Sequence, residues 1–190
     1  MTTALIIIDV QNAILSGLAS AERQPVVDAA LDAVVARLAV VKARARTAGV
    51  PVILVQHDGS DDHRLRTGSD GWRLRAEIAA GPPTLRPSDI VVHKTNCDSF
   101  YATDLQARLE AFGATHLVVG GCMTPYCIDT TVRRAVSLGF DVTLLSDGHM
   151  TADTDSLTFD QIVEHHNSVL DGFDAGAHHV RLQACAGIAF

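Results

Sequence analysis

Cys127 is the residue of this chain with the clearest potential for covalent chemistry. It follows an apolar run that begins at Leu117, and two glycines and a proline lie between that run and the cysteine. The residues after Cys127 are apolar at helical spacings, so the segment predicts a strand, a tight turn and a helix. A thiol in the first turn of a helix is expected to lose its proton more easily, because free backbone N–H groups and the positive end of the helix dipole stabilise the thiolate.

A packing role is the alternative interpretation of Cys127, since free cysteines are often small core residues. Its position after the predicted turn favours the chemical interpretation. The chain contains 4 cysteines, and we interpret Cys97, Cys122 and Cys185 as packing residues. Their spacing fits neither a disulfide scaffold nor a zinc ribbon, so reduced thiols in a cytoplasmic protein are expected.

Asp9 is a candidate for acid–base chemistry. It lies near the carboxyl end of the apolar run Ala4–Val10, which is typical of a strand buried on both faces of a parallel sheet. An isolated carboxylate in such a place is costly, so Asp9 needs a partner or a chemical task. Parallel sheets carry their chemistry at the carboxyl ends of strands, although a cap or turn role for Asp9 is the alternative.

Lys94 ends another apolar run, Asp89–Lys94, whose β-branched residues again predict a strand. A lysine at the carboxyl end of a strand is usually solvated. Taken alone, Lys94 is therefore interpreted as a structural residue.

The rest of the chain alternates predicted strands with predicted helices. Apolar residues at helical spacing predict a long helix over Pro25–Ala48, and Val50–Gln56 has the composition of a buried strand. Further elements are predicted as a helix over Leu105–Phe112, a strand over Asp141–Leu145, a helix over Phe159–Leu170 and a strand over His178–Gln183. This alternation favours a single α/β domain over residues 1–190, with three α/β/α layers around a mainly parallel, Rossmann-like sheet.

The composition argues against some classes of partner. Of 190 residues, 47% are hydrophobic and 19% charged, and the formal net charge is −7. No basic patch is present, so nucleic acid is not expected as a partner. The first residues lack the basic segment of a signal peptide, and Asp9 interrupts their apolar run, so neither a signal peptide nor a membrane contact is expected.

The turn around Cys127 matches a known signature, Gly-x-x-Thr-x-x-Cys-(Val/Ile)-x-x-Thr. The matching residues are Gly121, Thr124, Cys127, Ile128 and Thr131. On this motif the chain resembles the isochorismatase-like cysteine hydrolases, close to their nicotinamidase and streptothricin hydrolase branches.

Two separate segments extend this resemblance. Asp9-Val10-Gln11-Asn12 resembles the first motif of the family, an Asp followed two residues later by Gln. Lys94 is followed by a stretch that resembles the family pattern Lys-x-x-x-(Ser/Asp)-(Ala/Ser)-Phe, with Asn96, Ser99, Phe100 and Tyr101 in it. The likeness covers the chain from Ala4 to about Gln183.

The resemblance implies a catalytic triad of Asp9, Lys94 and Cys127. Asp9 would act as general base toward Cys127, and Lys94 would keep Asp9 ionised and stabilise the thiolate. The resemblance also implies a non-proline cis peptide at Cys122–Met123 and an oxyanion hole made by the backbone N–H groups of Met123 and Cys127. The implied reaction is hydrolysis of a small amide through a thioester.

Apolar and aromatic residues near these motifs are the predicted substrate contacts: Ile14, Trp72, Phe100 and Tyr126. Many members of the family carry an aromatic residue where this chain has Ile14, so the shape of the pocket wall is expected to differ. Trp72 offers a flat apolar surface to a substrate, with an ordinary core or subunit-contact role as the alternative.

The segment His57–Ala80 is polar and irregular, and His57, Asp58 and His63 lie in it. Some nicotinamidases of the family bind a metal through an Asp and several His of this region, which leaves a metal site open as an alternative. We favour a solvated loop that folds over the active site, and we expect neither a metal nor another cofactor.

The chain is therefore expected to be a metal-independent cysteine amidohydrolase that acts on a small-molecule amide. Two alternatives stay open: an isochorismatase-type ether hydrolase, and a non-catalytic binding or assembly member of the fold. The joint presence of Asp9, Lys94 and Cys127 argues against the second. The family also implies a homo-oligomer, a dimer or larger.

Overall fold

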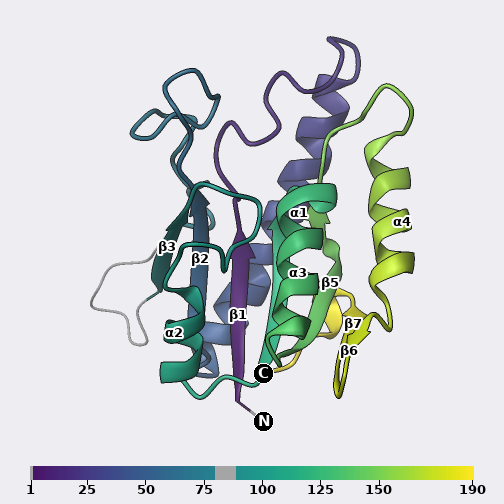
Figure 1. Cartoon of the computed structure of the whole chain (residues 1–190). Coiled ribbons are helices and arrows are strands. Elements are labelled where there is room, and N and C mark those ends of the chain that lie inside the picture. Colours follow the sequence, from purple (N-terminus) through teal and green to yellow (C-terminus); the bar gives the residue numbers. More distant parts are fainter. Residues whose placement is uncertain (1, 80–88) are drawn as a thin grey trace.

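A seven-stranded sheet with the order β3-β2-β1-β4-β5-β7-β6 forms the centre of the computed structural model, which describes residues 2–79 and 89–190. The strands are β1 (Thr3–Ile8), β2 (Val52–His57), β3 (Ile90–Lys94), β4 (His116–Cys122), β5 (Asp141–Met150), β6 (Asp174–Ala175) and β7 (His178–Gln183). Neighbouring strands are parallel except for β6 and β7, which are antiparallel. The predicted mainly parallel α/β sheet is confirmed (Figure 1).

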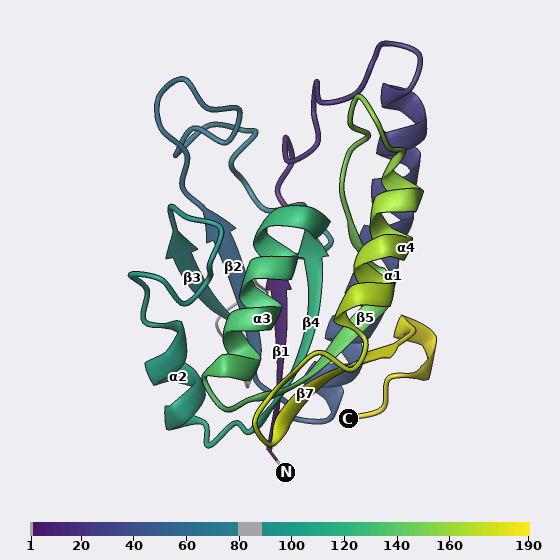
Figure 2. The ribbon, with the colours of Figure 1, turned by 45° about the vertical axis from the view of Figure 1, so that its right-hand side comes forward.

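Helices cover both faces of this sheet. The helix α1 (Gln24–Thr47) packs on one face through buried residues spaced by three or four: Val27, Leu31, Val34, Leu38 and Val41. On the opposite face lie α2 (Leu105–Ala111) and α3 (Asp129–Ser137), and α4 (Phe159–Leu170) runs alongside β5 and β7. Figure 2 shows α3 in front of the sheet and α1 behind it, so the predicted three layers are confirmed.

Within residues 2–79 and 89–190, we find no helix with the length and apolarity that a membrane span requires.

The carboxyl ends of the central strands meet at one edge of the sheet. Ile8, near the end of β1, pairs with Val55 of β2 on one side and with Gly121 of β4 on the other. At the next boundary His57 of β2 pairs with Lys94 of β3. The segments that follow β1, β3 and β4 therefore begin close together, which brings separated parts of the sequence to one place (Figure 2).

The strand β5 is longer than expected. The predicted strand ended at Leu145, but the pairing with β4 resumes beyond an irregularity and continues to Met150. Glycines permit this, because a Cβ added at Gly120 would lie 2.7 Å from the carbonyl oxygen of Gly148. The two backbones approach each other more closely there than side chains would allow. The short strand β6 was not predicted, since two residues carry no periodicity.

The loop after β2 is tied to the edge of the sheet by glutamine side chains. Gln11 Nε2 donates to the carbonyl oxygens of His57 and Trp72 at 3.0 and 2.7 Å, and Gln56 Nε2 donates to the same Trp72 carbonyl at 2.8 Å. Buried amides that bond in this way fix the path of a polar segment. The predicted loop His57–Ala80 thus folds against the carboxyl ends of β1 and β2, apart from Ala80, which lies outside the described residues.

Candidate active site

Asp9, Lys94 and Cys127 form one buried cluster. Lys94 Nζ lies 2.6 Å from Asp9 Oδ2 and 3.3 Å from Cys127 Sγ. The three residues come from the ends of β1 and β3 and from the segment after β4, where the sheet topology brings those ends together. The cluster therefore combines an acid, a cation and a thiol within hydrogen-bonding range.

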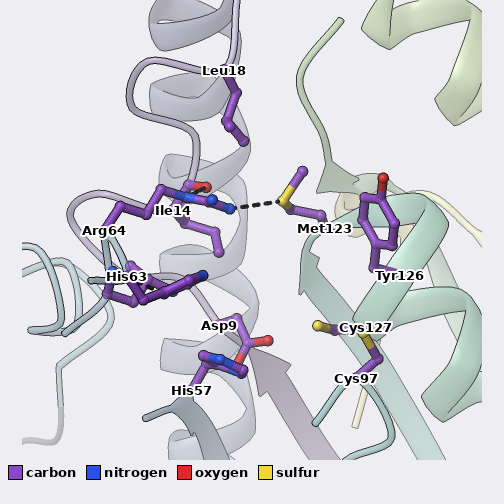
Figure 3. A pocket seen from close by; sticks show the side chains of 11 residues that line it. Asp9, Ile14, Leu18, His57, His63, Arg64, Cys97, Met123, Tyr126 and Cys127 are labelled. Carbon is purple, nitrogen blue, oxygen red and sulfur yellow. Dashed lines mark hydrogen bonds between the residues drawn. The ribbon is translucent and has the colours of Figure 1, made fainter. Parts of the chain in front are cut away.

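Asp9 follows β1 with a left-handed backbone, at a φ of 52°, which non-glycine residues seldom adopt. Its side chain is 1% exposed. Among the described residues, no hydrogen-bond partner reaches its second oxygen, Oδ1. Burial raises the pKa of the Asp9 carboxyl above its ordinary value, while Lys94 opposes that rise. Figure 3 shows the carboxylate pointing toward Cys127, so an unused acceptor faces the thiol.

Lys94 is also fully enclosed, with a side chain that is 0% exposed. Burial lowers the pKa of its ammonium, but the neighbouring Asp9 and Cys127 outweigh burial and raise that pKa above its ordinary value. A third contact, from Nζ to the Asn96 carbonyl oxygen at 2.9 Å, completes the environment of the ammonium. Lys94 is thus held as a cation between the carboxylate and the sulfur.

Cys127 does not lie in the first turn of a regular helix, as the sequence predicted. It lies in a single wide turn, η1 (Thr124–Ile128), in which Ile128 N–H bonds back to the Met123 carbonyl oxygen at 3.2 Å, and α3 begins only at Asp129. Burial and the Asp9 charge raise the pKa of the Cys127 thiol, with Lys94 opposing them. The expected lowering of the thiol pKa is therefore wrong for the resting site, where Cys127 is a protonated thiol.

A buried hydrogen-bonded chain that the sequence interpretation missed holds this turn. Thr124 Oγ1 and Asn167 Oδ1 each lie 2.9 Å from a ring nitrogen of His149. Asn167 Nδ2 donates to the Ser146 carbonyl oxygen, so its Oδ1 accepts from His149 Nε2–H and the His149 Nδ1 accepts from Thr124. Burial lowers the pKa of His149 to about 4, which keeps the ring neutral. The turn that carries Cys127 is thereby linked to β5 and α4.

A cavity of about 310 Å³ opens above the cluster. Its lining residues are Asp9, Ile14, Leu18, His57, His63, Arg64, Leu65, Cys97, Met123, Tyr126 and Cys127. Figure 3 shows Ile14, His63 and Arg64 on one side of the cavity and Met123, Tyr126 and Cys127 on the other. Ile14 and Tyr126, two of the predicted substrate contacts, thus line the cavity, and the peptide bond Cys122–Met123 is cis.

Trp72 and Phe100, which were predicted to contact substrate, do not line this cavity. The Trp72 indole donates to Asp58 Oδ1 at 2.7 Å and stacks on His93, at a centroid distance of 5.9 Å. Phe100 is buried in the core on the α3 face, where it stacks on Phe140. Both aromatic rings are occupied by protein contacts, which corrects those two predictions.

Several lining residues were not assigned to the site from the sequence. His57 ends β2, whereas His63 and Arg64 belong to the loop that was expected to fold over the site. The polar, irregular character of this segment was the only available signal for them. Cys97 was interpreted as a packing residue, but it is exposed and lines the cavity with Cys127. That interpretation is wrong.

His57 lies next to the cluster but does not act as a cation there. Burial and the nearby Lys94 lower the pKa of His57 to about 4.

Across residues 2–79 and 89–190, no group of three or more His, Cys, Asp or Glu side chains is arranged to hold a metal ion.

Comparisons with known proteins identify a matching family model and several relatives. A model of the isochorismatase domain matches residues 3–175. The streptothricin hydrolase of Streptomyces noursei is 39% identical over 150 residues, which is 79% of this chain but 50% of that protein. The chain thus spans about half the length of this relative. The ureidoacrylate amidohydrolase of Methylobacterium radiotolerans is 31% identical over 181 residues, covering 82% of this chain and 70% of that protein.

Solved structures share the fold over nearly the whole chain. The crystal structure of an isochorismatase from Pseudomonas putida is similar with a TM-score of 0.80 at 26% identity. The match covers 98% of this chain and 89% of that one.

Proposed function

The chain belongs to the isochorismatase family of hydrolases, and from that premise we propose that it is a cysteine amidohydrolase that cleaves a C–N bond of a small amide or lactam. One observation carries the proposal. A single buried ammonium, Lys94 Nζ, contacts both the carboxylate of Asp9 and the sulfur of Cys127, and these two residues line a cavity. Two relatives named as a streptothricin hydrolase and a ureidoacrylate amidohydrolase support the same class of reaction.

In this proposal Asp9 takes the proton of the Cys127 thiol as the sulfur attacks the amide carbon. The raised thiol pKa makes such a base necessary, because little thiolate exists before substrate binds. The unused Asp9 Oδ1 is available for that proton. Lys94 then stabilises the developing negative charge on the sulfur.

The attack produces a tetrahedral intermediate whose oxyanion accepts hydrogen bonds from the backbone N–H groups of Met123 and Cys127. Both residues line the cavity. Collapse of this intermediate breaks the C–N bond, and the protonated Asp9 donates its proton to the leaving nitrogen. Asp9 next removes a proton from water, the water attacks the thioester, and the acid leaves as Cys127 recovers its proton.

Alkylation rates test whether Cys127 is activated. At neutral pH, iodoacetamide should modify Cys127 faster than the other cysteines, because only this thiol has a buried carboxylate to accept its proton. Mass spectrometry of peptides sampled over time measures each rate. Cys97 is an exacting comparison, since it is exposed and lines the same cavity. Equal rates at Cys97 and Cys127 would overturn the proposal.

The pH dependence of that rate should identify the base. Asp9 must be ionised to accept the proton, and burial raises its pKa. The rate at Cys127 should therefore fall as the pH drops through this raised pKa, which lies above the value of about 4 at which an ordinary aspartate titrates. Asp9→Asn should slow alkylation and remove this acid limb, whereas an acid limb that persists in Asp9→Asn would exclude Asp9 as the base.

A further inference from the structure

Arg64 places a guanidinium in the cavity without a carboxylate partner. Its Nε–H donates to the Ile14 carbonyl oxygen at 3.0 Å, and one Nη2–H points at the Met123 sulfur at 3.5 Å. Within the described part of the chain, no aspartate or glutamate forms an ion pair with it. Since a guanidinium has five N–H groups, the two contacts orient Arg64 and leave donors for another group. Figure 3 shows the contact from Arg64 to the Met123 sulfur as a dashed line.

The other charges of the cavity cancel or are absent. Asp9 and Lys94 neutralise each other as an ion pair. Burial lowers the pKa of His57 to about 4 and also lowers that of His63, so both rings are neutral at pH 7. The cavity therefore has a net positive charge, which Arg64 provides, although the whole chain has a formal charge of −7. A partly buried cation in this situation attracts an anion.

His63 supplies a second donor next to Arg64. The backbone N–H of Leu65 donates to His63 Nδ1 at 3.1 Å, so the proton of the neutral ring is on Nε2. Figure 3 shows the His63 ring on the same side of the cavity as Arg64. An arginine fork beside a neutral N–H donor suits the two oxygens of a carboxylate.

We propose that Arg64, assisted by His63, binds a carboxylate of the substrate, so that the substrate is an anionic amide. Such a molecule carries the scissile C–N bond at Cys127 and a carboxylate at the opposite wall, within a cavity of about 310 Å³. This inference rests on the proposed function, because it assigns the substrate class to that same site. It predicts that an acid is preferred over its neutral ester or amide.

A pair of alkylating agents of nearly equal size tests the charge preference. Iodoacetate and iodoacetamide differ chiefly in charge, so their rate ratio at Cys127 reports how strongly the cavity favours a carboxylate. Arg64→Gln should lower the ratio of iodoacetate to iodoacetamide rates by about tenfold or more. Arg66→Gln is the matched control, since it removes the same charge from an exposed position of the same loop, and it should leave the ratio nearly unchanged. An equal ratio in wild type and Arg64→Gln would overturn the inference.

A binding measurement separates this inference from the proposed chemistry. In Cys127→Ala, calorimetry should show that N-carbamoylglycine binds more tightly than its neutral amide, by about tenfold or more. The added Arg64→Gln change should remove this difference, and Arg64→Lys, which keeps the charge but not the fork, should retain part of it. Equal affinities for the acid and the amide in Cys127→Ala would refute the carboxylate site. If neither iodoacetate nor iodoacetamide alkylated Cys127, the proposed role of Cys127 as nucleophile would be refuted. The binding measurement in Cys127→Ala would still show whether Arg64 forms a carboxylate site.

Discussion

Replacing Cys127 by alanine should reduce amide hydrolysis by at least about a thousandfold, because removal of a covalent nucleophile leaves only the contributions of binding and the oxyanion hole. The change deletes one buried sulfur and leaves Asp9, Lys94 and the cavity wall in place. Release of ammonia or amine from a panel of small amides measures the loss. The panel should include nicotinamide, a streptothricin-type lactam and N-carbamoylglycine.

Two cysteine variants control for the loss of a thiol. Cys185→Ala removes a buried sulfur remote from the cavity, and Cys97→Ala removes the second thiol that lines it. Cys185→Ala should keep hydrolysis within about tenfold of wild type, since its sulfur does not line the cavity. Cys97→Ala should keep far more hydrolysis than Cys127→Ala, since Lys94 donates to the sulfur of Cys127 and the described residues show no such bond to Cys97. Hydrolysis that survives in Cys127→Ala would move the chain toward an ether hydrolase without a cysteine nucleophile. Activity on no amide, even in wild type, would favour a non-catalytic member of the fold.

Lys94→Met should destabilise the protein by about 3–5 kcal/mol at neutral pH, because it leaves the carboxylate of Asp9 buried without its partner. The two side chains are 0% and 1% exposed, so water does not compensate for the loss. The same change should lower the rate of hydrolysis strongly, since Lys94 also contacts the sulfur of Cys127. Urea unfolding measures the first effect, and kcat/KM on the best amide of the panel measures the second.

Two further variants separate stability from catalysis. Arg23→Met breaks an ion pair with Asp153 whose side chains are 39% and 14% exposed, and it should cost no more than about 1 kcal/mol. The double variant Asp9→Asn with Lys94→Met removes both buried charges, so it should recover much of the lost stability and none of the activity. Equal unfolding free energies for Lys94→Met and Arg23→Met would contradict the buried pair as a source of stability.

The positions of Asp9, Lys94 and Cys127 in the fold could be predicted from the sequence, because each residue ends or follows an apolar strand. Buried runs identify parallel strands, and parallel strands bring their carboxyl ends to one edge of the sheet. Asp9, Lys94 and the turn of Cys127 were therefore expected at the same edge of the sheet, where the structure places them. Their grouping as a triad came from the resemblance to the family, because Lys94 taken alone was interpreted as a structural residue. The signature around Cys127 added the identity of the family.

The residues that line the cavity were harder to predict from the sequence, because contacts between distant segments of the chain determine their positions. Trp72 was predicted to contact substrate, yet its indole N–H donates to Asp58, and its carbonyl oxygen accepts a hydrogen bond from Gln11. The same loop carries Arg64 into the cavity, and no periodicity of a polar segment indicates which of its side chains point inward. The link between Thr124 and His149 spans 25 positions and depends on the unpredicted extension of β5.

The protonation state of Cys127 also could not be predicted from its local sequence. A helix N-terminus predicts a lowered thiol pKa, but burial and the nearby charge of Asp9 raise it. The proposed division of labour follows from this balance, because a thiol that keeps its proton at rest requires a base at the moment of attack.

The most direct test of that account is mass spectrometry of the protein quenched during turnover of an amide. The acyl group should add to the peptide that contains Cys127, should appear before the acid product is released, and should be absent in Cys127→Ala. Hydrolysis that proceeds with no adduct on Cys127 at any quench time, and at an unchanged rate in Cys127→Ala, would contradict the covalent mechanism.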